Sequence, residues 1–94
     1  MSDDVSASTW RVEIQLGEHE GRTRAVARLR THDRTALVGT GLARLNPKDH
    51  DVPEIGAELA TARALHDLAD RLLGAVVGDI ADVTHEDVEL SDLR

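Results

Sequence analysis

The sequence contains no cysteine, phenylalanine or tyrosine, and its single tryptophan is Trp10. Without cysteine the chain can form neither disulfide bonds nor thiolate metal sites, which is typical of a protein from a reducing compartment. With so few aromatic residues, a core has to be built from Leu, Val, Ile and Ala. A chain of 94 residues then forms one small domain with little surplus stability, and such domains often recruit a partner.

Long apolar runs are also missing. None approaches the roughly 20 residues that a membrane-spanning helix needs. The first eight residues, Met1 to Ser8, are acidic and polar, whereas a secretory signal begins with a basic segment followed by an apolar one. We therefore expect a soluble cytoplasmic protein without membrane association, in which residues 1–8 form a flexible N-terminus.

Patterns typical of catalysis or cofactor binding are absent from the sequence. The five histidines have no metal-ligand spacing, and the serines, at positions 2, 6, 8 and 91, fall in expected tails. Gly39 and Gly41 resemble the start of a dinucleotide fingerprint, but no third glycine follows at the required spacing. We expect these glycines to mark a bulge or a close backbone approach. The sequence thus predicts no enzyme, no cofactor, no metal and no small-molecule substrate.

Three segments have the composition of β-strands. Residues 9–16 alternate between apolar and polar side chains, which is the period of a strand with one dry face. Residues 17–21, bounded by two glycines, form a hairpin connection to a second strand at residues 22–30. A turn at residues 31–34 leads to a third strand at residues 35–43. Because the third strand is apolar on both faces, it is predicted to be central in the sheet or covered on both sides.

A long amphipathic helix is predicted to follow. Asp51 and Glu54 have capping-box spacing, Pro53 suits the first turn, and Gly78 is a plausible C-terminal stop. Glu58 and His66 interrupt the apolar side and are expected to reach its margin or to form local hydrogen bonds. Arg63 and Asp67, and Asp67 and Arg71, are expected to pair on the opposite side. The residues predicted to cover the sheet are Ile55, Leu59, Ala62, Leu65, Ala69, Leu72, Leu73 and Val76.

These elements predict an α+β fold in one domain, residues 9–85, with a three-stranded antiparallel sheet followed by one long helix and an acidic C-terminal tail, residues 86–94. A helix of about 25 residues spans roughly 38 Å, whereas strands of eight or nine residues reach about 27 to 30 Å. The helix end, with Leu72, Leu73, Val76 and Val77, should therefore extend beyond the sheet and form a dimer interface. We predict a homodimer with helices or C-terminal segments exchanged or packed across a two-fold axis.

Positive charge is concentrated in one part of an acidic chain. The net charge is −7, yet residues 22–48 contain seven basic residues and one acid, a net +6, so the rest carries −13. The second strand places Arg22, Arg24, Arg28 and Arg30 at alternate positions on one face. This asymmetry indicates either an anionic partner or pairing with the acidic residues of the chain itself.

Three segments carry a resemblance to a known family: Gly-Glu-His-Glu-Gly-Arg-Thr-Arg-Ala at 17–25, Leu-Val-Gly-Thr-Gly-Leu-Ala-Arg-Leu-Asn-Pro at 37–47, and Pro-Glu-Ile-Gly-Ala-Glu-Leu-Ala-Thr-Ala-Arg-Ala-Leu at 53–65. The chain resembles, over about residues 9–85, small actinobacterial proteins grouped as a domain of unknown function, some of them induced in hypoxia and dormancy. The resemblance implies a dimer with a fold similar to double-stranded-RNA-binding domains, and a likeness to ribosome hibernation-promoting factors.

One departure from double-stranded-RNA-binding domains bears on function. Those domains grip phosphates with a lysine cluster at the start of their final helix, whereas this helix opens with Asp51, Glu54 and Glu58. Two hypotheses follow. The first is a dimeric stress or dormancy module that contacts ribosomal RNA through Arg22, Arg24, Arg28 and Arg30. The second is a protein-interaction or structural homodimer that binds no nucleic acid and whose arginines pair with its own acidic tail or with an acidic protein partner.

Overall fold

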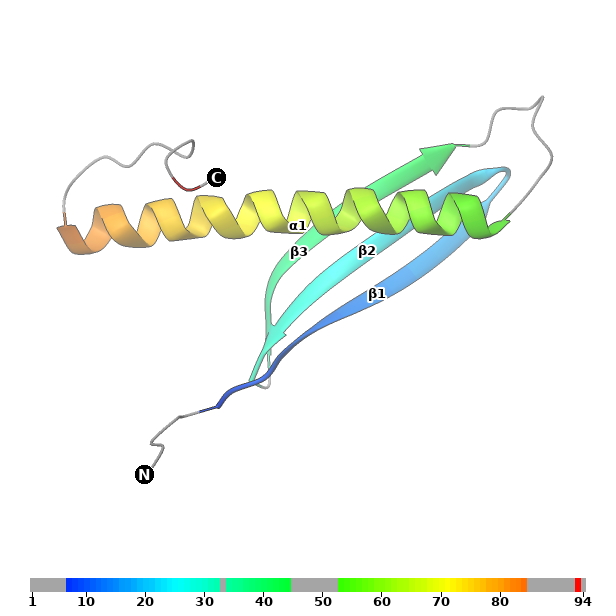
Figure 1. Ribbon diagram of the computed structural model, residues 1–94. Helices are drawn as coiled ribbons and strands as arrows, with labels where there is room; N and C mark the ends of the chain where they lie inside the picture. The colour runs from blue at the N-terminus through cyan, green and yellow to red at the C-terminus, as the bar shows by residue number, and fades with distance from the viewer. Residues whose placement is uncertain (1–6, 33, 45–52, 85–92, 94) are drawn as a thin grey trace.

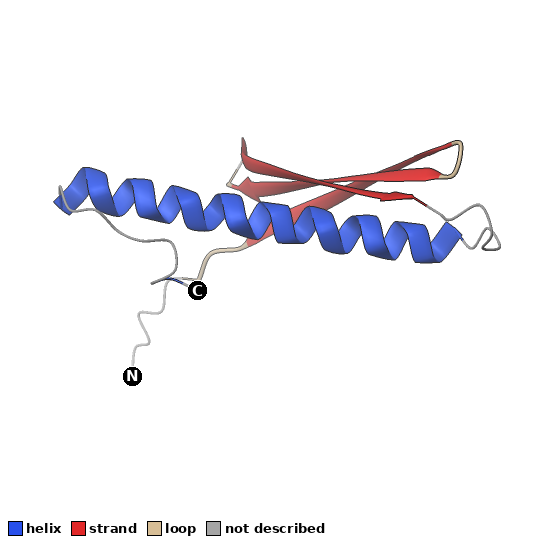
Figure 2. Cartoon of the chain, turned by 90° about the horizontal axis from the view of Figure 1, so that it is seen from above, coloured by secondary structure: helices blue, strands red, loops and turns tan. Residues whose placement is uncertain are grey.

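The computed structural model describes residues 7–32, 34–44, 53–84 and 93. Its elements are β1 (Trp10–His19), β2 (Arg22–Thr31), β3 (Arg34–Arg44) and α1 (Pro53–Thr84) (Figure 1). The strands form one antiparallel sheet in the order β1-β2-β3, and α1 covers one face of it (Figure 2). The predicted α+β class, with a three-stranded antiparallel sheet followed by one long helix, is confirmed.

The first hairpin is tighter than the glycine spacing predicts. β1 continues through Gly17 to His19, so the connection consists of Glu20 and Gly21 alone, with φ angles of 51° and 74°. Positive φ at both central residues defines the two-residue turn whose twist matches that of antiparallel strands. As a result, β1 and β2 pair without interruption from His19 opposite Arg22 to Trp10 opposite Thr31.

Neither environment predicted for the third strand, central in the sheet or covered on both sides, is found. β2 is central, and β3 is an edge strand with a register shift between Leu29 and Arg30 of its neighbour. Its apolar and glycine-rich composition has a different cause, because α1 lies directly on β3 and also reaches over its outer edge (Figure 1). β3 is therefore covered on one face and along its outer edge, whereas Val38 and Leu42 are exposed on its other face.

α1 is longer than predicted, with 32 residues, and it continues through Gly78 to Thr84. A single glycine inside a helix costs only about 1 kcal/mol relative to alanine, so it does not by itself end one. The C-terminal half of α1 extends beyond the sheet, as predicted (Figure 1). The Asp51 cap, the acidic tail at 86–94 and the flexible terminus at 1–8 fall wholly or largely outside the described residues.

The side of α1 that packs on the sheet is not the predicted one. Ile55, Leu59 and Leu65 are 40% to 56% exposed. The residues that face the sheet are smaller and recur every four positions: Gly56, Ala60, Ala64 and Leu68. Steric fit against β3 explains the choice, because a Cβ atom at Gly39 or Gly41 would overlap the α1 backbone between Ala60 and Leu68. The expectation that these glycines allow a close backbone approach is thus confirmed.

The core between the two layers is small. Its buried residues are Ala25, Ala27, Leu29, Ala43, Ala60, Ala64 and Leu68. Each Å² of apolar surface removed from water stabilises a fold by about 25 cal/mol. Because an alanine side chain has little apolar surface, a core built largely of alanine gives one chain only limited stability. Ile14, Leu37 and Leu72 add partly buried surface at the margin. No helix formed by the described residues is long and apolar enough to cross a membrane.

Candidate nucleic-acid interface

The face of the sheet opposite α1 is rich in arginine. On β2 the buried residues Thr23, Ala25, Ala27 and Leu29 alternate with side chains that point to the other face. That open face carries Arg22, Arg24, Arg28 and Arg30. The structure therefore brings the four predicted residues together in one row along the central strand, where a ligand can approach from the side that α1 leaves free.

Strand pairing adds two arginines that the sequence reasoning did not include. Arg44 on β3 lies opposite Arg22, and Arg11 on β1 lies opposite Arg30. Their alternation was visible in the sequence, but their membership of the open face depends on the register of the neighbouring strands. Like charges directly opposite each other destabilise a sheet. A bound anion would relieve that repulsion.

One end of this arginine face is internally compensated. Arg30 Nε lies 3.0 Å from Glu13 Oε2. Arg28 Nη1 donates a hydrogen bond of 2.9 Å to Gln15 Oε1. Both partners belong to β1, so these contacts tie the first two strands together across the open face. An anionic ligand would have to compete with Glu13 here, and we assign this end a supporting role.

The other end of the face carries Arg22, Arg24 and Arg44, all exposed. Among the described residues, no carboxylate forms an ion pair with any of these three arginines. Between the two ends lies a hollow of about 420 Å³ that includes Arg24, Arg28, Val26, Val38 and Thr40. It offers cationic groups beside a small apolar floor. Because no aromatic side chain lines it, the hollow suits contacts to phosphates and sugars better than base stacking.

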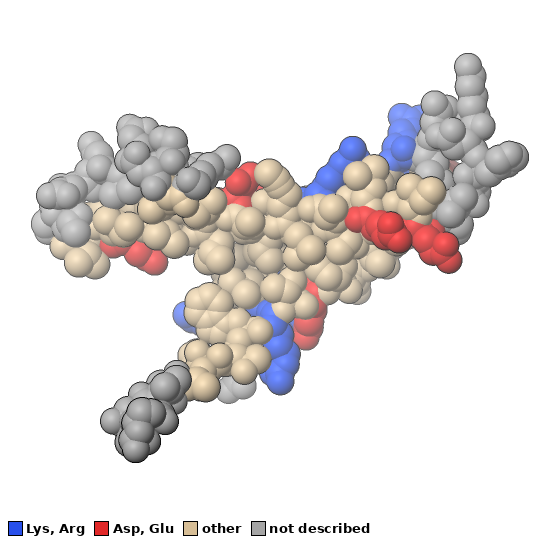
Figure 3. Space-filling view, in the orientation of Figure 1, with Lys and Arg blue, Asp and Glu red and all other residues tan. Residues whose placement is uncertain are grey.

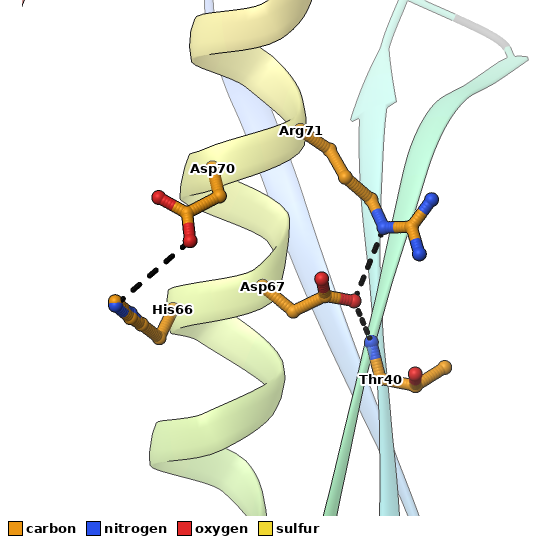
Figure 4. Close-up of polar contacts among 5 residues, drawn as sticks. All are labelled: Thr40, His66, Asp67, Asp70 and Arg71. Atoms are coloured by element: carbon orange, nitrogen blue, oxygen red, sulfur yellow. Dashed lines mark hydrogen bonds and ion pairs between the residues drawn. The ribbon is translucent and has the colours of Figure 1, made fainter. Parts of the chain in front are cut away.

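A separate polar cluster links α1 to the outer edge of β3 (Figure 4). The Thr40 backbone N–H donates to Asp67 Oδ2 at 2.8 Å, and Arg71 Nε donates to the same oxygen at 3.1 Å. These two contacts lower the pKa of Asp67, with the Thr40 hydrogen bond as the larger cause. The predicted Asp67–Arg71 pair is confirmed, although it lies at the sheet edge. Arg63 instead donates to the Leu42 carbonyl at 2.7 Å.

Histidines and carboxylates do not form a metal site in the described part of the chain. Within that part, no three His, Asp or Glu side chains come together in a group that could hold a metal ion. His66 Nε2 lies 3.9 Å from Asp70 Oδ2, one turn further along α1, and both side chains are largely open to solvent (Figure 4). As expected for a residue at the helix margin, His66 does not enter the core.

The helix residues proposed as a dimer interface differ in their surroundings. Leu72 packs partly against the core, Leu73 and Val77 are half-buried, and Val76 is exposed. On the side of the molecule seen in Figure 3, the surface along the middle of α1 is mostly uncharged, with acidic groups towards its two ends and at its upper margin. The chain thus presents two unlike surfaces, an arginine face on the sheet and an apolar side on the helix.

The fold and its surfaces define a small α+β protein with one helix on an antiparallel sheet. Residues 8–89 match the model of the Rv2632c-like family, and the chain belongs to that family. It is 57% identical over 81 residues to the uncharacterised protein Mb1767 of Mycobacterium bovis, covering 86% of this chain and 85% of that protein. It is 49% identical over 80 residues to the uncharacterised protein Rv2632c of Mycobacterium tuberculosis, covering 85% of each.

A solved structure supports the same assignment. The crystal structure of Rv2632c superposes with a TM-score of 0.79 at 45% sequence identity, over 89% of this chain and 99% of that one. These relatives establish the family and the arrangement of strands and helix. Their names assign no activity, so function has to be argued from the surfaces of this chain.

Proposed function

We propose that the protein is a dimeric nucleic-acid-binding module of stress or dormancy physiology that contacts ribosomal RNA through the arginine face. The observation that carries this proposal is the exposed group Arg22, Arg24 and Arg44, for which the described residues supply no carboxylate partner. Arginine forms bidentate contacts with phosphate and keeps its charge at all physiological pH values. The resemblance to double-stranded-RNA-binding domains and to hibernation-promoting factors supports the same ligand class.

The chemistry of the face favours backbone contacts over base recognition. Phosphate contacts fix the position of a protein on RNA but carry no sequence information. The face also carries no Phe, Tyr or Trp side chain for base stacking. The acidic start of α1, with Glu54 and Glu58, would repel phosphate, so RNA should approach the sheet and avoid the helix. The proposal predicts binding that depends on charge and shape with little dependence on sequence.

The decisive experiment is co-sedimentation of the protein with ribosomes and separated subunits at about 50 mM and 200 mM salt, because phosphate contacts weaken steeply over this range. Saturable binding that survives the higher salt supports the proposal. The double variant Arg22→Glu and Arg24→Glu should abolish that binding while the far-UV circular dichroism spectrum stays unchanged.

A matched control compares the single variant Arg24→Glu with the same charge change elsewhere. Arg34 lies at the start of β3, far along the sheet from Arg22, and is also exposed. Arg34→Glu should retain most of the binding. Equal losses in Arg34→Glu and in Arg24→Glu would show that net charge alone determines association, and the arginine face would lose its assignment. Absence of ribosome binding at both salt concentrations would refute the RNA proposal itself.

A second candidate function rests on the apolar side of α1. Ile55, Leu59, Leu65 and Val76 are exposed, and soluble proteins seldom leave such a row uncovered without a partner. This observation favours a protein-interaction or structural homodimer in which the arginines bind acidic protein groups. The co-sedimentation experiment separates the two candidates, because only the RNA-binding module accompanies ribosomal particles.

A further inference from the structure

The two edges of the sheet are treated differently. Along β3, side chains of α1 cover the outward backbone groups, since Asp67 accepts from Thr40 N–H and Arg63 donates to Leu42 O. Along β1, none of the described residues bonds to the outer edge, and α1 barely touches this strand. A long uncovered edge is a template for pairing with another strand.

The hairpin geometry determines which groups on β1 point outward. In a two-residue turn of this type, the flanking residues His19 and Arg22 exchange both backbone hydrogen bonds. Bonded pairs then alternate, so the odd-numbered residues of β1 bond to β2. The even-numbered residues from Trp10 to Glu18 direct their N–H and C=O groups outward. By the same alternation, the backbone groups of Thr40 and Leu42 on β3 point away from β2. Their hydrogen bonds to side chains of α1 agree with this direction.

The even-numbered residues of β1 also carry its apolar side chains. On the helix side of the sheet, α1 covers β2 and β3 but leaves β1 open. The β1 side chains on that side, Trp10, Val12 and Leu16, are therefore 55%, 44% and 48% exposed. The helix is centred over the other two strands and leaves this row open. An added strand would therefore satisfy the outward backbone groups of these residues and bury their side chains at the same time.

We propose that the occupant is β1 of a second copy, paired antiparallel about a two-fold axis through Ile14 to give a continuous six-stranded sheet. This inference deepens the homodimer of the proposed function by naming its interface, and it does not depend on RNA binding. Outward groups pair only when even-numbered residues face even-numbered residues, so few registers are allowed. An axis at Glu13 would place two carboxylates opposite each other and is disfavoured.

With the axis at Ile14, residues 10–18 of the two β1 strands pair along their whole length with compatible side chains opposite each other. Val12 then faces the partner's Leu16, Glu13 faces Gln15, and Arg11 faces Gly17, so no like charges are opposed. An axis at Gln15 also uses most of the strand, but it sets Val12 against Glu18 and leaves Trp10 beyond the paired residues. Complementarity of apolar and charged side chains therefore selects Ile14.

A hollow in the structure lies where this register would bring the partner's tryptophan. It measures about 270 Å³ and is lined by Leu16, Gly17, Glu18, Thr23, Glu54 and Ala57, between the end of β1 and the start of α1. The volume is below the range of about 300 to 1,000 Å³ typical of small-molecule pockets. In the proposed dimer, Trp10 lies opposite Glu18 of the other copy, beside this hollow.

The pairing would also join the arginine faces of the two copies into one continuous surface.

The test uses amide hydrogen exchange of the wild-type protein by NMR at concentrations below and above the dimerisation midpoint found by sedimentation equilibrium. The amides of the odd-numbered residues Arg11, Glu13 and Gln15 bond to β2, so they should be protected from exchange at both concentrations. The even-numbered amides Val12, Ile14 and Leu16 should gain protection only in the dimer, with a blue shift of the Trp10 fluorescence. A dimer whose even-numbered amides still exchange rapidly would overturn the proposal, as would a protein that stays monomeric.

Two variants locate the interface independently. Val12→Lys should give a folded monomer, because a lysine on the uncovered row of β1 blocks strand addition. Val76→Lys makes the same change on the exposed helix side and should remain dimeric. The reverse result would move the interface to α1 and refute β1 pairing. Ribosome binding is measured separately. If the Arg22→Glu/Arg24→Glu variant loses ribosome binding while the β1 amides stay protected, the result concerns the RNA proposal and leaves the dimer proposal unaffected.

Discussion

The two sides of α1 differ in the size of their side chains and in what they contact. One side, Gly56, Ala60, Ala64 and Leu68, lies on the sheet close to β3. The other, with Ile55, Leu59 and Leu65, carries larger apolar side chains and faces outward. A helix normally buries its larger apolar residues because they remove more surface from water. Here, steric fit between two backbones outweighs that preference.

This difference separates the two tasks of the helix. The small side holds the domain together through close contact with Gly39 and Gly41, and little apolar area is buried in the process. The large side contributes little to the fold of one chain and is available for a partner. Substitutions on the small side should therefore lower the free energy of unfolding, whereas substitutions on the large side should change it little.

The largest effect is expected at Gly41. Gly41→Ala places a Cβ atom where it overlaps the backbone of Ala60 and Ala64, and backbone cannot move aside as a flexible side chain can. Overpacking of this kind destabilises by about 1 to 3 kcal/mol or more, and we expect the upper end. Urea unfolding at fixed protein concentration measures it. The control Gly17→Ala, on β1 with no atom within 4 Å of the new Cβ, should change stability far less.

A leucine pair tests the comparison directly. Leu68 is buried against the sheet and Leu65 is exposed on the outer side. Leu68→Ala should lower the free energy of unfolding by about 2 to 3 kcal/mol, at the lower part of the range for leucine truncation, because the small core can partly close. Leu65→Ala should lower it by less than about 1 kcal/mol. Similar losses for both variants would contradict the assignment of a buried and a free side.

The pH dependence of stability should report the contact between α1 and the β3 edge. Since the pKa of Asp67 is lowered in the folded state, its contribution is fully present above the ordinary value of 3.8 and is lost as the pH falls below it towards the folded-state pKa. Urea midpoints should therefore decrease less at acidic pH for Asp67→Asn than for the wild type. Parallel pH profiles for the two proteins would show that the hydrogen bond from Thr40 does not stabilise the carboxylate.

The smallest effect is expected in the overhanging half of α1. Gly74 lies inside the helix, and a Cβ atom there would meet no other atom within 4 Å. Gly74→Ala should raise the free energy of unfolding by about 0.5 to 1 kcal/mol, because alanine loses less conformational entropy in a helix. Thermal unfolding by circular dichroism can measure the shift. A destabilised variant would indicate that another chain packs against Gly74.

Three antiparallel strands were predicted from the apolar alternation of residues 9–16 and from the turn-forming residues after it. One helix was predicted from the longer apolar period after Pro53. The alternation of Arg22, Arg24, Arg28 and Arg30 likewise predicted their common face. The roles of Arg11 and Arg44 were not predicted, because they depend on strand register. The Gly78 stop was wrong because local propensity is weak compared with the preference of the flanking residues for a continuing helix.

The kind of each element follows from the sequence alone because hydrogen bonds within a helix, and the alternation of side chains along a strand, are local properties. Which side of α1 is buried does not follow, since it depends on Gly39 and Gly41 lying beneath Ala60 and Ala64 after the chain has folded back on itself. The same holds for the edges of the sheet. Only the tertiary structure brings Arg63 and Asp67 to β3 and leaves α1 with little contact to β1, because a helix of fixed direction can cover one edge at a time.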